Sequence, residues 1–309
     1  MNQKQITQIN NPINREFINS FHRLGLPMHF NHYGNKEFSN YQRVALIILY
    51  RRSKKSLRDF TKELHESLWI NWLDLRKVPK KSTIHLWLKL FNMRHIRMLN
   101  SVLLTHKTRL TAVDGTGFDS WQRRRHYAKR IGEPNMPYAK ADLFVEVNSK
   151  EILDFSLHCH RIADVRAAEY FFKRSKISGL TILADGAYDS EPLHQIVRNK
   201  GAKLFAPVRK NSGNKPRGKY RKECVELPEF QGMRSIVETI NFMLKQTQIS
   251  CLKSKKSIMK QREFGWHVVL HNIKRKILLG ESLEKQEILF LLIVENQLLW
   301  TRPLFPQHL

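Results

Sequence analysis

The sequence is poor in cysteine, in acidic side chains and in long apolar runs. Its 309 residues include three cysteines, Cys159, Cys224 and Cys251, and no C-x-x-C pair, which excludes a disulfide framework and an ordinary structural zinc site. The longest apolar run, Ile288 to Val294, is far shorter than the roughly twenty residues that cross a bilayer, so we expect no membrane partner. The opening residues lack the apolar core of a secretory signal, so we expect a cytoplasmic location.

The shortage of acids leaves the chain strongly basic. Lys and Arg number 54 against 27 Asp and Glu, so the formal net charge is +27. Because 41% of the residues are hydrophobic, the chain can still bury a core, and the charge does not indicate disorder. A polyanion would relieve the self-repulsion. Nucleic acid is the commonest such partner, an anionic membrane surface is the next, and a basic surface without a ligand is the plainest alternative.

The pattern of the sequence changes near residue 105 and predicts two main parts. Residues 1–104 show helical periodicity, with a capping-box-like start at Ser56 to Asp59 and a new helix after Pro79. We therefore expect a small all-α N-terminal domain that could bind DNA ends, and a helical packing domain without a ligand is the alternative. Residues 105–275 are expected to form an α/β domain with a mixed sheet flanked by helices, and residues 276–309 a C-terminal extension.

Short β-type runs alternate with helical stretches in this second part. Strands are expected at Arg109–Val113, Leu143–Val147, Ile152–His158, Leu180–Ala184 and Lys203–Val208, and helices at Asp164–Arg174, Glu191–Lys200 and Gln231–Gln246.

Two aspartates directly follow predicted strands, and each has a glycine behind it. Asp114 follows the first strand of the α/β part, and Asp185 follows the fourth. Open α/β sheets place ligands at the carboxyl ends of neighbouring strands, so the two carboxylates could converge in space. The alternative is that each Asp-Gly pair simply makes a turn.

The predicted helix Gln231–Gln246 carries charged side chains on one stripe. At about 100° per residue, Arg234 lies roughly 40° and Lys245 roughly 20° from Glu238 around the helix axis. The opposite face is apolar and can pack on a sheet. The alternative is a surface ion pair between Arg234 and Glu238, which would contribute about 0.3 to 0.5 kcal/mol.

Together these residues resemble the DDE-type transposases of prokaryotic insertion sequences. The resemblance covers about residues 108–250 and includes Asp114, Asp185 and the spacing of Arg234, Glu238 and Lys245. The signature of that family begins with a tyrosine three positions before the arginine, where this sequence has Gln231. The resemblance implies an RNase H-like fold and a DNA transposase that cleaves transposon ends and transfers strands to target DNA by phosphoryl transfer.

The resemblance also implies roles for the individual residues. Asp114, Asp185 and Glu238 would be catalytic and would hold two divalent ions, Mg²⁺ or Mn²⁺, which prefer oxygen ligands. Arg234 and Lys245 would contact phosphates beside the scissile bond. The partners would be the DNA of the transposon ends and of the target, and we expect a homodimer in the DNA complex. The alternatives are a catalytically inactive DNA-binding protein derived from a transposase and a related RNase H-like nuclease.

Other charged residues are weaker candidates for the same function. Basic side chains expected to bind DNA follow the first aspartate and the fifth strand, namely Arg123, Arg124, Arg125, Arg130 and Lys210. A merely solvated loop is the alternative for the segment that contains Lys210. Possible rivals for the catalytic roles are Asp119, Asp142, Asp154, Asp164 and Asp189. Asp189 is the nearest contender, and a helix cap is its simplest role.

Overall fold

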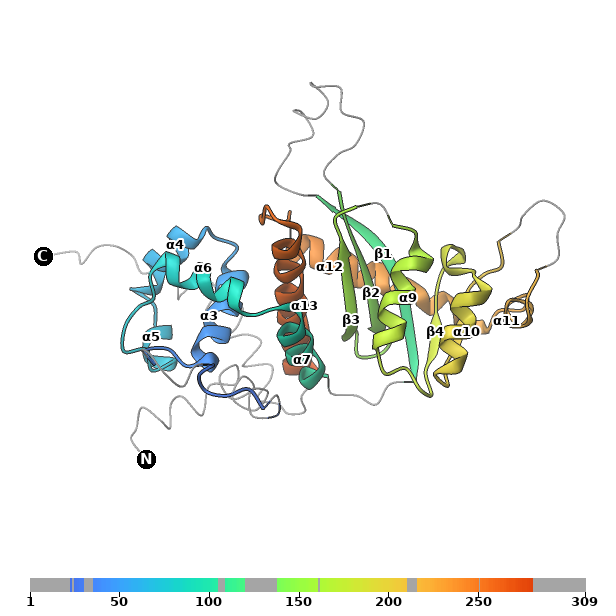
Figure 1. Cartoon of the computed structure of the whole chain (residues 1–309), viewed down its shortest axis with the longest axis horizontal. Helices are drawn as coiled ribbons and strands as arrows, with labels where there is room; N and C mark the ends of the chain where they lie inside the picture. The colour runs from blue at the N-terminus through green and yellow to red at the C-terminus, as the bar shows by residue number, and fades with distance from the viewer. Residues whose placement is uncertain are drawn as a thin grey trace, which may run out of the picture. The chain divides into compact units, whose positions relative to one another are not determined.

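The structure is a computed structural model that describes residues 23, 25–30, 36–104, 109–119, 138–160, 162–209, 216–249 and 251–279. The chain divides into two compact units (Figure 1). One unit comprises Met1–Leu103 with Ile273–Leu309, and the other comprises Leu104–Asn272. No helix in the described ranges combines the length and the apolar character needed to span a bilayer.

The described part of the first unit is largely helical. Its helices are α3 (Asn40–Ser53), α4 (Leu57–Leu64), α5 (Trp69–Trp72), α6 (Lys81–Leu90) and α7 (Met93–Leu103). Ser39 and Gln42 form a capping box that begins α3, and the Ser56 hydroxyl accepts a hydrogen bond from the Asp59 amide at 3.2 Å at the start of α4. The start predicted for α4 is therefore confirmed, as is the helix after Pro79.

The second unit is built on a five-stranded mixed sheet. Its strands are β1 (Leu110–Asp119), β2 (Tyr138–Glu146), β3 (Ile152–His158), β4 (Thr181–Leu183) and β5 (Lys203–Phe205). The strand order is β3-β2-β1-β4-β5. The pairs β1–β2 and β2–β3 are antiparallel, whereas β1–β4 and β4–β5 are parallel. The mixed sheet that the sequence predicts is therefore confirmed.

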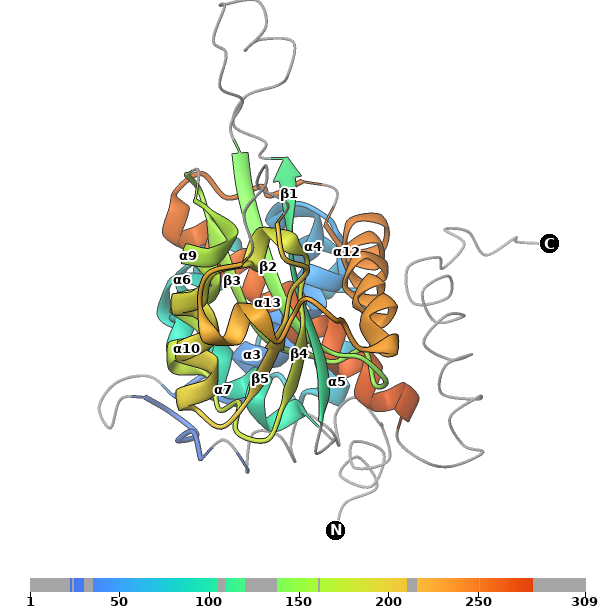
Figure 2. The same cartoon turned by 90° about the vertical axis from the view of Figure 1, so that its right-hand side faces the viewer.

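Helices cover both faces of this sheet (Figure 2). One face packs on α9 (Asp164–Arg174) and α10 (Glu191–Asn199), and α12 (Ile236–Thr247) contacts β1 and β2 from the other side. The remaining elements are the 3₁₀ helices η1 (Gly186–Tyr188) and η2 (Glu229–Ser235), the short helix α11 (Lys219–Lys222) and α13 (Ser257–Leu279). Phe144 of β2 packs against Phe172 of α9, with ring centroids 5.6 Å apart. On the other face, Phe118 meets Phe264 of α13 at 5.3 Å.

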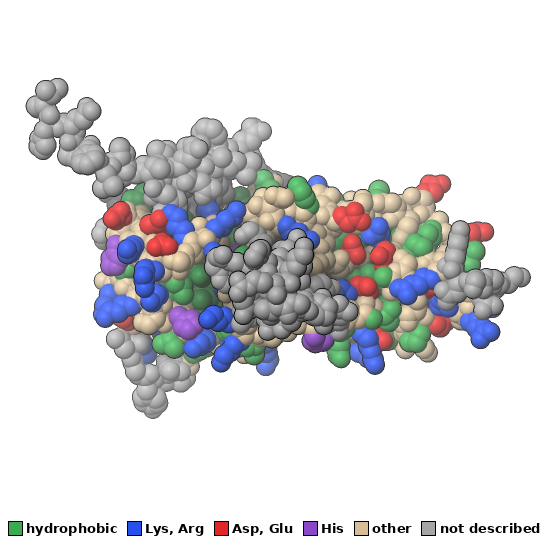
Figure 3. All heavy atoms as spheres, turned by 90° about the horizontal axis from the view of Figure 1, so that it is seen from above, with side chains coloured by type: hydrophobic (Ala, Val, Ile, Leu, Met, Phe, Trp, Pro, Cys, Tyr) green, Lys and Arg blue, Asp and Glu red, His purple; other side chains and the backbone are tan. Residues whose placement is uncertain are grey.

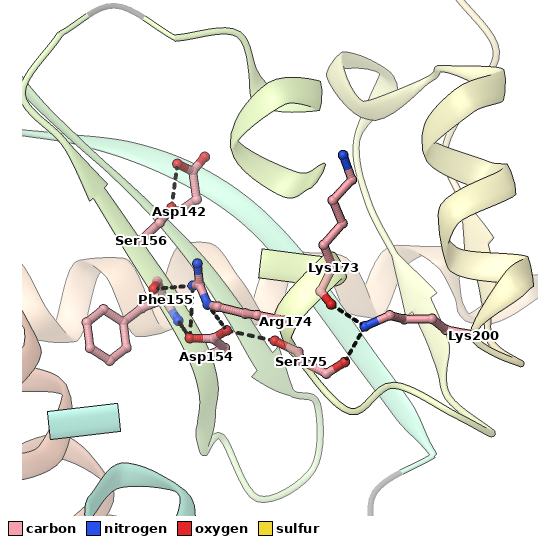
Figure 4. Close-up of polar contacts among 8 residues, drawn as sticks. All are labelled: Asp142, Asp154, Phe155, Ser156, Lys173, Arg174, Ser175 and Lys200. Atoms are coloured by element: carbon pink, nitrogen blue, oxygen red, sulfur yellow. Dashed lines mark hydrogen bonds and ion pairs between the residues drawn. The ribbon is translucent and has the colours of Figure 1, made fainter. Parts of the chain in front are cut away.

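The end of α9 is tied to β3 by Asp154 (Figure 4). The Arg174 guanidinium donates to both carboxylate oxygens of Asp154, at 2.8 and 3.0 Å, and the Ser175 hydroxyl donates to the same carboxylate at 2.7 Å. Asp154 is mostly buried and is occupied by these contacts. Its role is therefore to hold a helix on the sheet, and it is not a rival for a catalytic role.

Three predicted boundaries are wrong in ways that affect the site. The first strand does not end before Asp114 but runs on to Asp119. The second strand begins at Tyr138 instead of Leu143, and every residue of β2 pairs with β1. Two glycines, Gly115 and Gly117, remain in this ladder. The helix predicted from residue 231 begins at Ile236, and the preceding residues form η2. Arg234 therefore lies on a 3₁₀ helix and Glu238 on an α-helix.

Candidate active site

Side chains alternate along β1 and so serve opposite faces of the sheet. Asp114 contacts Arg234, and Thr116 contacts Lys245, so both point toward the face covered by α12. Gly115 points to the opposite face, toward the start of α9. Asp114 therefore faces the helix that carries Glu238 although it lies in the middle of a strand rather than at its end.

Asp185 comes close to Asp114 through the parallel pairing of β1 and β4. Ala112 is opposite Leu183 in this register, and each aspartate lies two residues further along the chain. The Asp185 carboxylate accepts a hydrogen bond from the Ala187 amide at 2.7 Å, which caps η1. The charges of the two aspartates therefore interact, even though β4 ends at Leu183.

Arg234 joins two of the predicted catalytic acids. Its guanidinium lies 3.7 Å from Asp114 Oδ2 and 3.2 Å from Glu238 Oε1. The Asp114 side chain is 18% exposed and that of Glu238 is 59% exposed. The structure thus brings Asp114, Arg234 and Glu238 into direct contact.

The carboxyl of Asp114 lies in an unfavourable environment for a negative charge. Burial raises its pKa, and the neighbouring Asp185 and Glu238 carboxylates raise that pKa further. The Gly115 amide, which donates to Asp114 Oδ1 at 2.8 Å, and the Arg234 guanidinium lower it. Three carboxylates therefore interact at one place, and additional positive charge there would stabilise them.

The residue types of this cluster fit hard divalent cations, because they offer only carboxylate oxygens. Among the described residues, no three Asp, Glu, His or Cys side chains are grouped closely enough to hold an ion as they stand. Arg234 supplies positive charge between Asp114 and Glu238 instead.

Lys245 lies about two helical turns beyond Glu238 on α12, and its side chain contacts β1. Its ammonium donates to the Thr116 hydroxyl at 2.6 Å and lies 5.3 Å from the centroid of the Phe118 ring. The prediction that Lys245 lies on the same side of the helix as Glu238 is consistent with this position, because both side chains are exposed and the buried side of α12 consists of other residues. These buried residues are Val237, Ile240, Asn241 and Leu244.

Gln231, at the position where the resembling family has tyrosine, makes a contact that the sequence did not reveal. Its side-chain amide donates to the Ala184 carbonyl at 2.9 Å. Ala184 immediately precedes Asp185, so this hydrogen bond ties η2 to the end of β4 beside the aspartate. A glutamine side chain can donate to a backbone carbonyl in a helix, a strand or a loop. The sequence alone therefore does not distinguish Gln231 from a glutamine exposed on the surface.

Asp189 has a role that the sequence analysis assigned wrongly. It does not cap α10, whose N-cap position is Ser190. Instead, its buried carboxylate accepts two hydrogen bonds from the Arg221 guanidinium, at 2.6 and 2.7 Å, and a third from the Arg209 amide at 2.9 Å. These contacts lower the pKa of Asp189 against the opposing effect of burial. Asp189 therefore anchors both ends of the basic segment 209–222.

The same basic segment also reaches the turn after Asp185. The Arg209 side chain donates to the Gly186 carbonyl at 2.5 Å. Lys210 and the other predicted DNA contacts, Arg123, Arg124, Arg125 and Arg130, lie outside the described residues. On the face shown in Figure 3, Lys and Arg side chains are spread among Asp and Glu side chains instead of gathering in one patch.

Comparison with known proteins defines the class to which this site belongs. The family model described as "Transposase DDE domain" matches residues 105–273, which is more than half of the chain. The chain therefore belongs to the family of transposase DDE domains. It is a DNA transposase, an enzyme that cleaves and transfers DNA, as the sequence predicts.

A solved structure and the curated proteins complete the comparison. The chain is similar to a piggyBac transposase seen by cryo-EM in a synaptic complex with hairpin DNA, with 12% identity and a TM-score of 0.47. The match covers 99% of this chain and 84% of that chain. None of the curated proteins matches the chain.

Proposed function

We propose that this transposase uses Asp114, Asp185 and Glu238 as its catalytic acids, in an RNase H-like domain that binds two Mg²⁺ or Mn²⁺ ions. The observation that carries the proposal is that Asp114 interacts electrostatically with both Asp185 and Glu238, while Arg234 contacts Asp114 and Glu238. These residues are far apart in the sequence, and the parallel β1–β4 pair together with the packing of α12 on β1 supports their convergence.

The chemistry proposed is phosphoryl transfer in two steps. Water attacks the phosphodiester at the element's end and forms a new P–O bond while the bond to the 3′ oxygen breaks, which frees a 3′ hydroxyl. That hydroxyl then attacks a target phosphodiester, so one P–O bond replaces another and no external energy source is needed. When bound, a pair of divalent ions would activate the attacking oxygen and stabilise the leaving one. The three carboxylates would hold these ions.

Arg234 and Lys245 are proposed to contact the phosphates that flank the scissile bond. Both are cationic side chains at the acid cluster, and guanidinium can bind a phosphate through two parallel hydrogen bonds. Arg234 would exchange its contacts with Asp114 and Glu238 for the DNA backbone when cations neutralise these acids. Arg123, Arg124, Arg125, Arg130 and Lys210 are proposed to extend the DNA-binding surface.

The proposed partners are the DNA of the transposon ends and of the target. A helical N-terminal domain, residues 1–104, would bind the ends, and two copies of the chain would form a homodimer in the DNA complex. The net charge of +27 supports a polyanionic partner. We propose that the protein is located in the cytoplasm in association with DNA.

The substitution Asp185→Asn tests the catalytic assignment. It removes a proposed metal ligand and leaves every basic side chain in place. We expect cleavage of duplexes that carry the sequences flanking the coding region to fall by more than about 100-fold, since even outer partners of metal ligands are worth about 10- to 100-fold. DNA affinity, measured by fluorescence anisotropy, should change little.

Glu169→Gln is the matched control, because it removes one carboxylate from α9 on the other face of the sheet. The ion pairs of Glu169 within the described ranges are with the exposed Arg166 and Lys173, at 3.6 and 3.7 Å. Its cleavage rate should equal that of the wild type. Wild-type cleavage by Asp185→Asn would overturn the assignment. A strand-transfer assay with pre-cut ends separates a transposase from a nuclease that cuts without joining.

A further inference from the structure

A buried cluster of charges lies on the α9 face of the sheet, behind the candidate active site. Lys140 and Asp142 of β2 are 6% and 0% exposed, and the Lys140 ammonium lies 3.4 Å from Asp142 Oδ1. The same ammonium donates to Asp164, the first residue of α9, and to the Ile162 carbonyl at 3.3 Å. Lys140 therefore joins the second strand to the start of the helix that covers it.

Asp142 is held by two neighbours, Ser156 and Lys140, and one of its oxygens makes no hydrogen bond within the described ranges. Its Oδ2 accepts a hydrogen bond from the Ser156 hydroxyl of β3 at 3.3 Å (Figure 4). Its Oδ1 makes no hydrogen bond with any other described residue and is held by the charge of Lys140 alone. Buried charged groups of this kind stabilise a fold only weakly, because removing them from water costs about as much as their attraction returns. A role other than stability is therefore worth seeking.

The cluster adjoins the candidate site at Gly115. In the β1–β2 ladder, Gly115 is directly opposite Asp142, and it follows Asp114 in the chain. A Cβ atom at position 115 would lie 2.8 Å from Asp142 Oδ1, 2.8 Å from Lys140 Cε and 3.1 Å from Asp164 Oδ1. The charged side chains thus fill the space on one face of the strand, while Asp114 occupies the other face.

We propose that Lys140, Asp142 and Asp164 form a positioning cluster that fixes the β1 backbone at Gly115 and so sets the place of the Asp114 carboxylate. The inference rests on the proposed role of Asp114 and deepens it. Three elements, β2, β3 and α9, meet at this cluster, whereas Asp114 itself is tied to the backbone only through the neighbouring Gly115 amide. Any displacement of the cluster moves the peptide that carries Asp114.

The test combines a substitution that creates a steric clash with a second substitution that reduces this clash. Gly115→Ala puts a methyl group 2.8 Å from both Asp142 Oδ1 and Lys140 Cε, and Asp142→Ala removes the first of these two contacts. We expect Gly115→Ala to weaken Mn²⁺ binding by the full-length protein, measured by calorimetry, by about 10- to 100-fold, the range for groups that orient metal ligands. The double variant should recover part of the lost affinity, because the closest carboxylate contact is gone while Lys140 still joins β2 to Asp164 of α9. Melting temperatures of all variants, measured in parallel, separate displacement of the site from loss of the fold.

Gly232→Ala is the control, because a Cβ atom at that position meets nothing within 4 Å. It should bind Mn²⁺ as the wild type does. Wild-type affinity in Gly115→Ala, or a double variant no better than Gly115→Ala, would overturn the inference. If Gly115→Ala does not fold, Asp164→Ala replaces it: the Asp164 side chain is 32% exposed and Lys140 keeps Asp142 as its partner, so the loss should lower Mn²⁺ affinity while the protein stays folded. An unchanged affinity would then contradict the cluster's role.

Asp114→Asn keeps the two proposals distinguishable. If this variant binds Mn²⁺ like the wild type, the proposed catalytic site itself is wrong. If it loses Mn²⁺ binding while Gly115→Ala keeps it, the catalytic site stands and only the positioning cluster fails.

Discussion

Asp142 illustrates how a single buried carboxyl makes the protein sensitive to pH. Burial raises its pKa to about 6, Lys140 opposes the shift, and Asp164 adds to it. The pKa of an aspartate in an unfolded chain is about 3.9. The folded protein therefore binds a proton more tightly than the unfolded chain does, and stability contributed by the protonated form is lost as the pH rises from about 4 to about 6.

We predict that Asp142→Asn removes the loss of stability that the wild type shows as the pH rises from about 4 to about 6. The amide keeps the shape and can still accept from Ser156, and Lys140 keeps Asp164 as its partner. At pH 7 the variant should be more stable than the wild type by about 1 to 3 kcal/mol, because a shift of one pKa unit corresponds to about 1.4 kcal/mol. Urea unfolding at several values between pH 4 and pH 8 measures the difference. A variant less stable than the wild type at pH 7 would show that the charge of Asp142 supports the fold.

Among the elements, Asp189 and Arg221 form the contact that fixes α11 near the end of the basic segment 209–222. The bidentate pair lies between a buried carboxylate and a mostly buried guanidinium, and both Tyr220 and Arg221 amides donate to Glu191 of α10. Short segments such as α11 have little apolar surface of their own. Their position therefore depends on these polar contacts.

We predict that Arg221→Met lowers the free energy of unfolding by about 2 to 4 kcal/mol, since it leaves the buried Asp189 carboxylate without its guanidinium. Arg198→Met is the matched control. Arg198 pairs with Glu223, whose side chain is 43% exposed, so its loss should cost about 1 kcal/mol or less. Denaturant unfolding measures the free energy of unfolding of both variants. Equal losses would mean that the Asp189–Arg221 pair contributes no more to stability than the Arg198–Glu223 pair.

The sequence predicts the elements with strong local signals and misses those set by distant contacts. The helix Asp164–Arg174 and the strand Ile152–His158 are found with their observed bounds, because periodicity and flanking turn residues mark both ends. The predicted first strand is too short because the sequence Asp-Gly-Thr-Gly is typical of a turn. Pairing with β2 keeps these residues extended instead. The role of Asp189 depends on Arg221, which lies 32 residues further along the chain, and no local pattern reveals it.

For the candidate site the same distinction holds. The convergence of Asp114, Arg234 and Glu238 follows from a strand, a helix and their charges, and it could be predicted. The buried Lys140 and its neighbours could not, because a lysine and an aspartate two residues apart on a strand are common on exposed faces. Only the packing of α9 against this face makes them buried.

At the scale of the whole molecule, the excess of positive charge is the dominant property. A net charge of +27 over 309 residues must repel itself unless a polyanion neutralises it. DNA carries a condensed atmosphere of counterions that binding releases, so affinity for it should depend steeply on salt.

We predict that DNA affinity falls by about 10³ to 10⁵ between roughly 50 and 200 mM salt if the protein contacts about six to ten phosphates. Fluorescence anisotropy with a labelled duplex over this range gives the slope. Lys245→Met, which removes one proposed phosphate contact, should reduce the magnitude of the slope by about one. A flat salt profile for the wild type would contradict DNA as the neutralising partner.

The hydrogen bond from Gln231 has a consequence for how such proteins diverge. Its acceptor is the carbonyl of Ala184, a main-chain atom that every amino acid at that position would supply. Residue 231 can therefore change from one donor to another without any compensating change at position 184. Covariation between the two positions should be weak among relatives, and the loss of a signature residue at this site need not accompany the loss of activity.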